Sequence, residues 1–277
     1  MVVCGTGVIA MWGILQSITI AGLMTVIEIG GLLVIIVLGA VNSPEFTLRL
    51  PEAAHALDSS APWNSILPAM LLAFFAFIGF EGLANIAEEV QEPERVLPKA
   101  IFITLVLSTL LYVAVVWVAL LAVPQSELAA SQAPLSLVFE RITRAPPAVI
   151  SLIAIIATLN GVIAQTVMAS RVLYGMAEQG LLPPLLGKVD RRTRTPVLAT
   201  FLVMVVILLL AVTFPLEGLA EMTSRVTLVV FALVNAALVQ LKRNGTPAPD
   251  GYFSVPILVP IAGLVLCVAM LLADLIW

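Results

Sequence analysis

The chain has 277 residues, of which 61% are hydrophobic and only 11% are charged, and its formal net charge is −4. Soluble domains carry about 25% charged and about 45–50% apolar residues, so this composition indicates a polytopic membrane protein. The acidic balance does not favour a nucleic-acid partner. With one histidine, His55, and two cysteines at opposite ends of the chain, neither a metal site nor another cofactor site is expected.

Seven segments are long and apolar enough to be membrane-spanning helices, because a bilayer core about 30 Å thick needs about 20 apolar residues per helix. A shorter apolar stub over residues 1–18 precedes them, and residues 1–277 are expected to form a single transmembrane domain. The expected spans are 19–40, 66–88, 97–122, 147–174, 196–214, 219–241 and 254–276.

The positive charges alternate between the connecting loops. Three loops, at 89–99, 171–195 and 242–253, hold nine of the thirteen lysines and arginines, and the intervening loops hold Arg49, Arg141, Arg144 and Arg225. Cytoplasmic loops carry the excess of Lys and Arg, so the first set is predicted to face the cytoplasm.

The first full span carries Glu28 near its centre, within TVIEIGGLL. A bare carboxylate at that depth costs about 2.5–3.5 kcal/mol, so the group must be protonated or paired. One interpretation is a proton-coupling carboxylate, and the other is a structural hydrogen bond to a neighbouring helix. The sequence favours the two equally.

The second full span is interrupted at Ile78–Gly82, where Glu81 lies between two glycines. Unwound backbone at membrane depth exposes N–H and C=O groups, which a ligand with an ammonium and a carboxylate satisfies. Phe75, one turn before the break, would cover the side chain of such a ligand. Alternatively, the glycines serve close helix packing and Glu81 pairs with a neighbour.

Polar side chains also interrupt the span over 147–174, at Asn160, Gln165 and Thr166. Asn160 and Thr166 are about 240° apart on a helical wheel at 100° per residue, so they need not share a face. Asn160 and Gln165 are candidate substrate contacts. Interhelical hydrogen bonds are the alternative.

A cytoplasmic gate is a fourth candidate. Glu88, Glu89 and Arg95 follow the interrupted span, and they would lock such a gate by ion pairs with arginines of the next cytoplasmic loop, namely Arg171, Arg191 or Arg194. Exposed ion pairs contribute only about 0–1 kcal/mol each, so a solvated loop that serves topology alone explains the charges equally well.

The sequence has no GxxxxGK[ST] phosphate loop, and it offers no Ser–His or Cys–His pair within the spans. A gradient-driven, non-enzymatic protein is therefore expected.

Three blocks of the sequence resemble the amino acid–polyamine–organocation permease superfamily. The most specific, FFAFIGFEGLANIAEEVQEPERVLPKAI at 74–101, is similar to the family's sixth helix and the loop after it. ASRVLYGMAEQGLLP at 169–183, followed by RTRTPVLAT, resembles the end of helix eight and the start of helix nine, and TVIEIGGLL resembles helix five. Among the members, bacterial permeases related to cationic amino acid transporters are the most similar.

The resemblance implies an all-α membrane protein with part of an inverted five-plus-five repeat fold of about twelve helices. The stub then corresponds to the end of helix four, and the seven spans to helices five to eleven. On this matching we expect the chain to lack helices one to three, most of helix four, and helix twelve.

The resemblance also implies roles for particular residues. Phe75, Ile78 and Gly79 match the substrate site on helix six, and Glu81 matches an acidic position implicated in proton sensing in some relatives. Glu28 stands where many relatives carry a lysine that replaces a bound sodium ion, and this departure leaves the coupling ion open. Gln165 falls near a substrate-facing position on helix eight.

The function implied is secondary active transport of amino acids across the plasma membrane by alternating access, either proton-coupled or by exchange. The alternatives are a non-transporting membrane fragment, an interaction partner, or a transporter of a related amine such as a polyamine.

Overall fold

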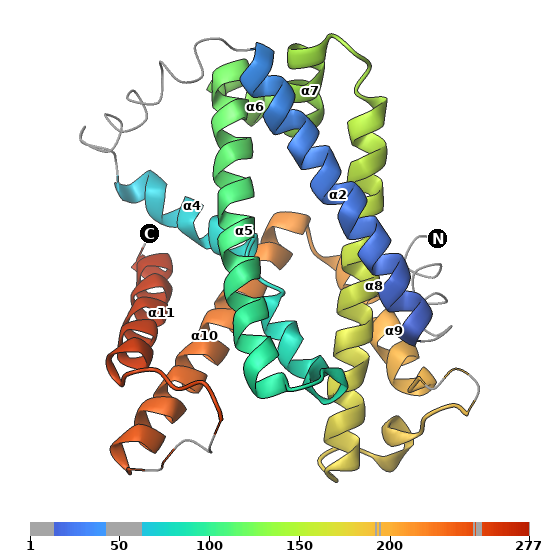
Figure 1. Ribbon diagram of the computed structural model, residues 1–277, viewed down its shortest axis with the longest axis vertical. Helices are drawn as coiled ribbons and strands as arrows, with labels where there is room; N and C mark the ends of the chain where they lie inside the picture. Colours follow the sequence, from blue (N-terminus) through green and yellow to red (C-terminus); the bar gives the residue numbers. More distant parts are fainter. Residues whose placement is uncertain are drawn as a thin grey trace. The chain divides into compact units, whose positions relative to one another are not determined.

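Eleven helical elements are found in the part of the chain that the computed structural model describes. The described residues are 14–42, 63–191, 193, 195–245, 247 and 251–276. In chain order the elements are α2 (Ile14–Asn42), α4 (Trp63–Phe75), η1 (Phe80–Glu89), α5 (Pro93–Ala122), α6 (Gln125–Ala130), α7 (Pro134–Thr143), α8 (Ala148–Glu178), η2 (Pro184–Gly187), α9 (Val197–Thr213), α10 (Leu216–Arg243) and α11 (Leu258–Ile276) (Figure 1).

Several helix boundaries follow from prolines and from one left-handed residue. Pro134 opens α7, and Pro147 and Pro215 directly precede α8 and α10, where the fixed φ of proline suits a helix start. Arg144 ends α7 in the left-handed conformation, with φ at 58°, and its N–H donates to the Glu140 carbonyl at 2.8 Å.

Four helices within the described residues are both long and apolar enough to cross a membrane: Thr19–Asn42, Pro93–Ala122, Ala148–Glu178 and Leu216–Arg243. Three shorter apolar helices, Ala69–Leu83, Val197–Thr213 and Leu258–Asp274, accompany them. The fold class predicted from the sequence, an all-α membrane protein, is confirmed.

Apart from shifts of up to four residues at other helix ends, the helices differ from the expected spans in three places. α2 begins at Ile14, so the end of the expected stub is continuous with the first span, while residues 1–13 lie outside the described residues. The span expected over 66–88 is divided into α4 and η1. The loop expected over 123–146 contains the short helices α6 and α7.

The contacts divide the chain into two compact units. Unit 1 comprises Met1–His55 and Leu107–Leu209, and unit 2 comprises Ala56–Val106 and Leu210–Trp277. Each unit therefore combines segments that are distant in the sequence, and the boundaries fall inside α5 and α9.

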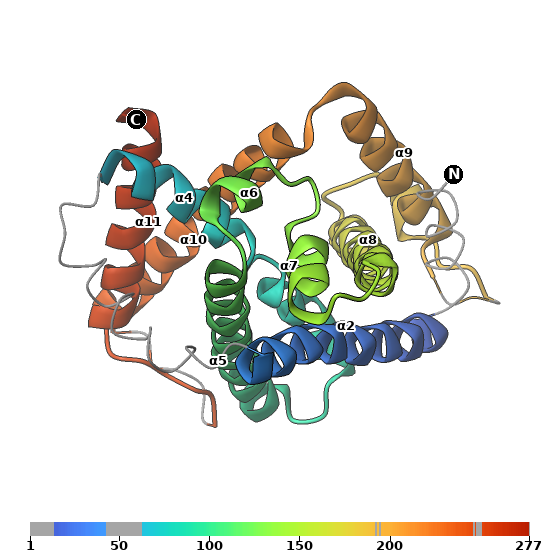
Figure 2. The ribbon, with the colours of Figure 1, turned by 90° about the horizontal axis from the view of Figure 1, so that it is seen from above.

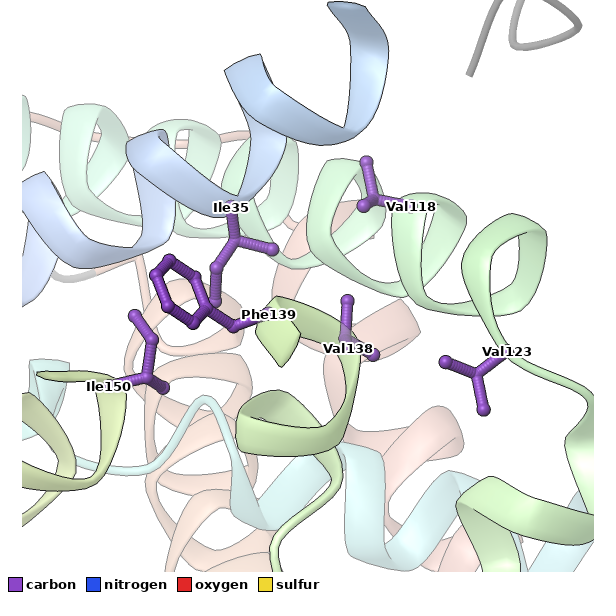
Figure 3. Packing of buried hydrophobic residues seen from close by; sticks show 6 residues of the cluster. All are labelled: Ile35, Val118, Val123, Val138, Phe139 and Ile150. Carbon is purple, nitrogen blue, oxygen red and sulfur yellow. The ribbon is translucent and has the colours of Figure 1, made fainter. Parts of the chain in front are cut away.

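Unit 1 is built on the packing of α2 against α8 and α7, which Figure 2 shows from above. Its apolar cluster joins side chains of α2, α5, α7 and α8 (Figure 3), namely Ile35, Val118, Val123, Val138, Phe139 and Ile150. Gly39 of α2 allows a close approach to α5, because a Cβ at this position would collide with Val118. Small residues favour this kind of packing in lipid, where helix association depends on van der Waals contact.

Unit 2 is built on α10, which packs against α11 and α4. Leu71, Leu228 and Cys267 form its buried apolar cluster, one residue from each helix. Ser224 of α10 is fully buried, and its hydroxyl donates to the Leu71 carbonyl at 3.3 Å.

An ion pair joins α10 to the end of α11. The Arg225 guanidinium donates to both carboxylate oxygens of Asp274, from Nε at 2.7 Å and from Nη2 at 3.1 Å. Glu221, one turn earlier on α10, lies 3.5 Å from the same guanidinium. Bidentate geometry of this kind fixes orientation as well as charge. Both helix ends lie on the side that the charge count predicts to be non-cytoplasmic.

We expect Gly263→Ala to destabilise the pairing of α10 with α11. A Cβ on Gly263 would lie 2.7 Å from Oδ1 of Asn235, whose side chain is held by a 2.8 Å bond from Nδ2 to the Phe231 carbonyl. Overpacking of this kind costs about 1–3 kcal/mol. Thermal unfolding in detergent should show a midpoint a few degrees lower.

Gly218→Ala is the matched control, since a Cβ there would approach nothing closer than 3.6 Å. Alanine also favours a helix over glycine by up to about 1 kcal/mol. Equal unfolding midpoints for the two variants would contradict close packing at Gly263.

Candidate functional site

A polar cluster joins α2 to α8 inside unit 1. The amide Nδ2 of Asn160 donates to Oε1 of Glu28 at 2.7 Å and to Oγ1 of Thr25 at 3.1 Å. The Thr25 hydroxyl donates in turn to the Ala21 carbonyl at 2.9 Å. Asn160 is only 8% exposed, and its Oδ1 is buried without a hydrogen-bond partner among the described residues. The Glu28 carboxylate is thus paired with an amide donor across the helix interface.

The three polar residues of α8 have different surroundings. Asn160 contacts Glu28, and Thr166 is buried and donates to the Val162 carbonyl of its own helix at 2.6 Å. Gln165 is exposed. Five residues separate Asn160 from Gln165, which places them about 140° apart around the helix, so the two candidate substrate contacts do not meet.

A cavity of about 480 Å³ lies beside Glu28 within unit 1. Its walls come from α2, α8 and residues 132–136, and most of the lining is apolar. The polar side chains that line it are Glu28, Gln132, Ser136 and Thr158. Among the described residues, Glu28 is the only titratable side chain in the wall, which also includes the end of the α6–α7 connection and the first turn of α7, in the predicted non-cytoplasmic loop.

The backbone break lies in unit 2. α4 ends at Phe75, and η1 begins at Phe80. Gly79 adopts φ 131° and ψ −26°, a conformation that other residues rarely adopt, and its N–H donates to Oε2 of Glu81 at 2.8 Å. Glu81 thus accepts from a backbone N–H that the interrupted helix leaves without its usual carbonyl. The carboxylate and the glycine together shape the turn.

Aromatic rings surround this break. Phe74 and Phe80 flank it, and their ring centroids lie 6.0 Å and 5.8 Å from that of Phe231 on α10. Phe75 is 39% exposed, and Ile78 is partly exposed. Sequence reasoning missed Phe231, although Ser224, Leu228 and Phe231 follow the i, i+4, i+7 spacing of one helix face.

The expected cytoplasmic gate remains a prediction. The side chains of Glu88 and Glu89, and Arg194 as a whole, lie outside the described residues. Arg95 is exposed and lies 3.5 Å from Glu92, three residues before it, in a pair whose side chains are 68% and 66% exposed. An ion pair as exposed as this one contributes little to the stability of the fold.

No group of three or more histidine, cysteine, aspartate or glutamate side chains comes together as a metal site within the described part of the chain. His55 and Cys4 lie outside that part. The candidate residues therefore form two groups, with Glu28, Asn160 and Gln165 in unit 1 and the residues of the break in unit 2.

The apolar helices, one of them interrupted, and the carboxylates within them are those of a multi-pass helical membrane protein. The amino acid permease family profile matches residues 1–276, and the chain belongs to this family.

Three relatives illustrate the match. A branched-chain amino acid permease of Bacillus subtilis is 30% identical over 191 residues, which are 69% of this chain and 41% of the relative. A second branched-chain permease, from Lactococcus lactis, is 26% identical over 70% of this chain and 42% of its own length. The mitochondrial cationic amino acid transporter 3 of Arabidopsis thaliana is 35% identical over 63% of this chain and 29% of its own length. The chain thus spans less than half the length of these relatives.

Proposed function

We propose that this chain serves secondary active transport of amino acids across the plasma membrane. The observation that carries the proposal is the break between α4 and η1, where Gly79 has φ 131° and its N–H is turned towards Glu81. Interrupted helices place backbone donors and acceptors at membrane depth, where they bind the charged groups of a substrate. Membership of the amino acid permease family supports the same function.

Amino acids with apolar side chains are the proposed substrate class. Phe75 is partly exposed next to the break, and Ile78 and Gly79 add apolar and backbone surface. A pocket of this composition favours an aliphatic side chain over a charged one, whose burial without a partner is costly. Two of the relatives are named as branched-chain amino acid permeases, which supports the same class.

Glu28 is the proposed proton-coupling group. It is one of the carboxylates within the apolar helices, it is hydrogen-bonded to Asn160, and it borders the cavity that leads to residues 132–136. A proton would reach Glu28 along this cavity from the non-cytoplasmic side. Glu81 is a second proton-coupling candidate, although its carboxylate already accepts the Gly79 N–H.

Alternating access is the proposed mechanism. In transporters with broken helices, one bundle rocks against a scaffold around a site at the membrane midplane. Here the interrupted helix would move with its bound substrate, and Phe75 would close over the substrate side chain. Protonation of Glu28 would bias the exchange between the two orientations by removing a charge from the membrane interior.

The test is uptake of radiolabelled leucine, isoleucine, valine, lysine and the polyamine putrescine into proteoliposomes. The chain is compared with the product of the longest in-frame reading frame that contains it, here called the full reading-frame protein. Each is assayed with and without an inward proton gradient. We expect the branched-chain amino acids to accumulate in the full reading-frame protein, and more strongly with the gradient.

Other outcomes separate the alternatives. Preferred uptake of putrescine or lysine would contradict the proposed class of substrates with apolar side chains and would indicate a polyamine or a cationic amino acid as the substrate. The absence of uptake by both forms, with the proteins folded and inserted, would contradict transport and favour a non-transporting role for the chain.

A further inference from the structure

One of the two polar atoms in the Asn160 side chain forms no hydrogen bond among the described residues. Its Nδ2 donates to two acceptors on α2, whereas its Oδ1 is buried without a partner in the described part of the chain. Buried polar atoms are rarely left without hydrogen bonds, and each exception calls for an explanation. The residue is 92% buried, so bulk solvent does not reach this oxygen.

The observed orientation suits only one charge state of Glu28. An ionised carboxylate accepts hydrogen bonds and donates none, and it is well matched to the Asn160 Nδ2 at 2.7 Å. A protonated carboxyl group needs an acceptor for its O–H. A half-turn of the Asn160 amide about its last side-chain bond would exchange Nδ2 for Oδ1 and present that acceptor at the same place.

In the turned orientation the displaced amide nitrogen would need an acceptor of its own. On α10, Asn235 shows the arrangement directly, since its Nδ2 donates to the carbonyl of Phe231 four residues earlier at 2.8 Å. By analogy, the carbonyl of Ile156, four residues before Asn160 on α8, would be the acceptor in the turned orientation. The Thr25 hydroxyl now accepts from Asn160 Nδ2 and donates to the Ala21 carbonyl, and in the turned state its rotatable O–H would donate to Asn160 Oδ1 instead.

We propose that Asn160 is a positioning residue that turns its side-chain amide when Glu28 exchanges its proton, donating to the carboxylate and accepting from the acid. This inference deepens the proposed function and rests on the role of Glu28 as the proton carrier. Its consequence is that α2 and α8 stay joined in both charge states. Proton loading at Glu28 therefore does not separate these two helices, and Asn160 is not a substrate contact.

Glu28 is the only titratable residue of α2, and no other titratable side chain among the described residues lines the cavity beside it. The helices packed against α2 carry their titratable groups elsewhere. On α8, the first titratable residue after Asn160 is Arg171, which lies eleven residues later and about 16 Å further along the helix. The described groups on the neighbouring elements are Arg171, Tyr174 and Glu178 on α8, Glu140 and Arg141 on α7 with Arg144 at its end, and Glu94, Arg95, Lys99 and Tyr112 on α5. Arg141 is paired to Glu127.

The test is infrared difference spectroscopy of the purified full reading-frame protein labelled with carbon-13 at the asparagine side-chain carbonyl. The Asn160 band is assigned by its loss in Asn160→Thr. Between about pH 9 and pH 4, we expect this band to move to lower frequency as Oδ1 gains a hydrogen bond, together with the appearance of the Glu28 acid band. In Glu28→Gln the Asn160 band should stay fixed.

A matched pair of variants adds a functional readout. Threonine and valine have nearly the same shape, but only the threonine hydroxyl both donates and accepts. Valine removes the bond made in each charge state, and because a bond to the charged form is about twice as strong as one to the neutral form, the loss favours the neutral form by about tenfold. Asn160→Val should therefore move the pH of half-maximal uptake upwards by about one unit, and Asn160→Thr should keep it near that of the unchanged protein.

The outcomes separate this inference from the transport function. An Asn160 band that stays fixed while Glu28 titrates, or a Glu28 that does not titrate over this range, overturns the inference even if amino acids are taken up. Equal pH profiles for Asn160→Val and Asn160→Thr also overturn it. A moving band in a protein that transports no amino acid supports the inference and contradicts the proposed function.

Discussion

Glu28→Gln is expected to abolish the effect of a proton gradient on uptake by the full reading-frame protein. Glutamine keeps the shape of glutamate and an oxygen that accepts from Nδ2 of Asn160, so the contact between α2 and α8 is retained. It removes only the exchangeable proton. For transport with one proton, a gradient of one pH unit supports about a tenfold concentration ratio. Accumulation under such a gradient should therefore fall about tenfold.

Glu140→Gln is the matched control for this prediction. Glu140 is an exposed carboxylate on α7 in the same unit, and it does not line the cavity beside Glu28. The measurement is accumulation of labelled leucine in proteoliposomes with an imposed gradient, for both variants and the unchanged protein. Gradient-driven accumulation that survives in Glu28→Gln would remove Glu28 from the coupling mechanism and leave Glu81 as the candidate.

The sequence predicts that Glu28 is protonated or paired, but it does not identify the residue with which Glu28 is paired. Membrane burial required that the carboxylate be protonated or paired, and the apolar pattern placed it within a helix. Its partner, Asn160, is 132 residues away in the sequence. Helical periodicity indicates which face of a helix is polar, but it does not indicate which other helix lies against that face. The polar residues of α8 were therefore identified without their contacts.

The break in the second span was predicted from Gly79, Glu81 and Gly82, because a carboxylate between two glycines is unfavourable in a helix that faces lipid. The structure places the turn slightly earlier, between Phe75 and Phe80. The bond from the Gly79 N–H to Glu81 could not be predicted, since it depends on the unusual φ of the glycine. Nor could the sequence alone show Phe231 packing on the break from α10.

The helices α6 and α7 were missed because they have only 6 and 10 residues. Hydropathy over a membrane-length window does not detect elements of this size. Val138 and Phe139 of α7 are nevertheless buried in the apolar cluster of unit 1. The segment before α7 also lines the cavity beside Glu28. Hydropathy therefore indicates the long helices of this protein but not the short connecting helices that shape the candidate site.

Gly79→Ala is expected to reduce uptake by the full reading-frame protein at least about tenfold. A residue with a Cβ at φ 131° carries strain of about 1–3 kcal/mol, and relief of this strain requires the backbone to rotate. Rotation would carry the Gly79 N–H away from Oε2 of Glu81, which it now reaches at 2.8 Å. The backbone N–H and C=O groups at the break would then no longer be oriented to bind the charged groups of the substrate. The loss should appear in initial uptake rates at saturating and at low leucine concentrations.

Two companion variants show whether the geometry of the break is responsible. Gly22→Ala is the control for substitution itself, since an added Cβ on this helical glycine meets no atom of the described residues within 4 Å. Glu81→Gln keeps an oxygen that can accept from the Gly79 N–H but removes the charge, so lost pH dependence in this variant with a retained rate would indicate proton coupling at Glu81. If Gly79→Ala transports as fast as Gly22→Ala, the left-handed backbone at Gly79 is not needed for transport. The substrate site would then have to be sought away from this break, and the cavity beside Glu28 would be the next place to examine.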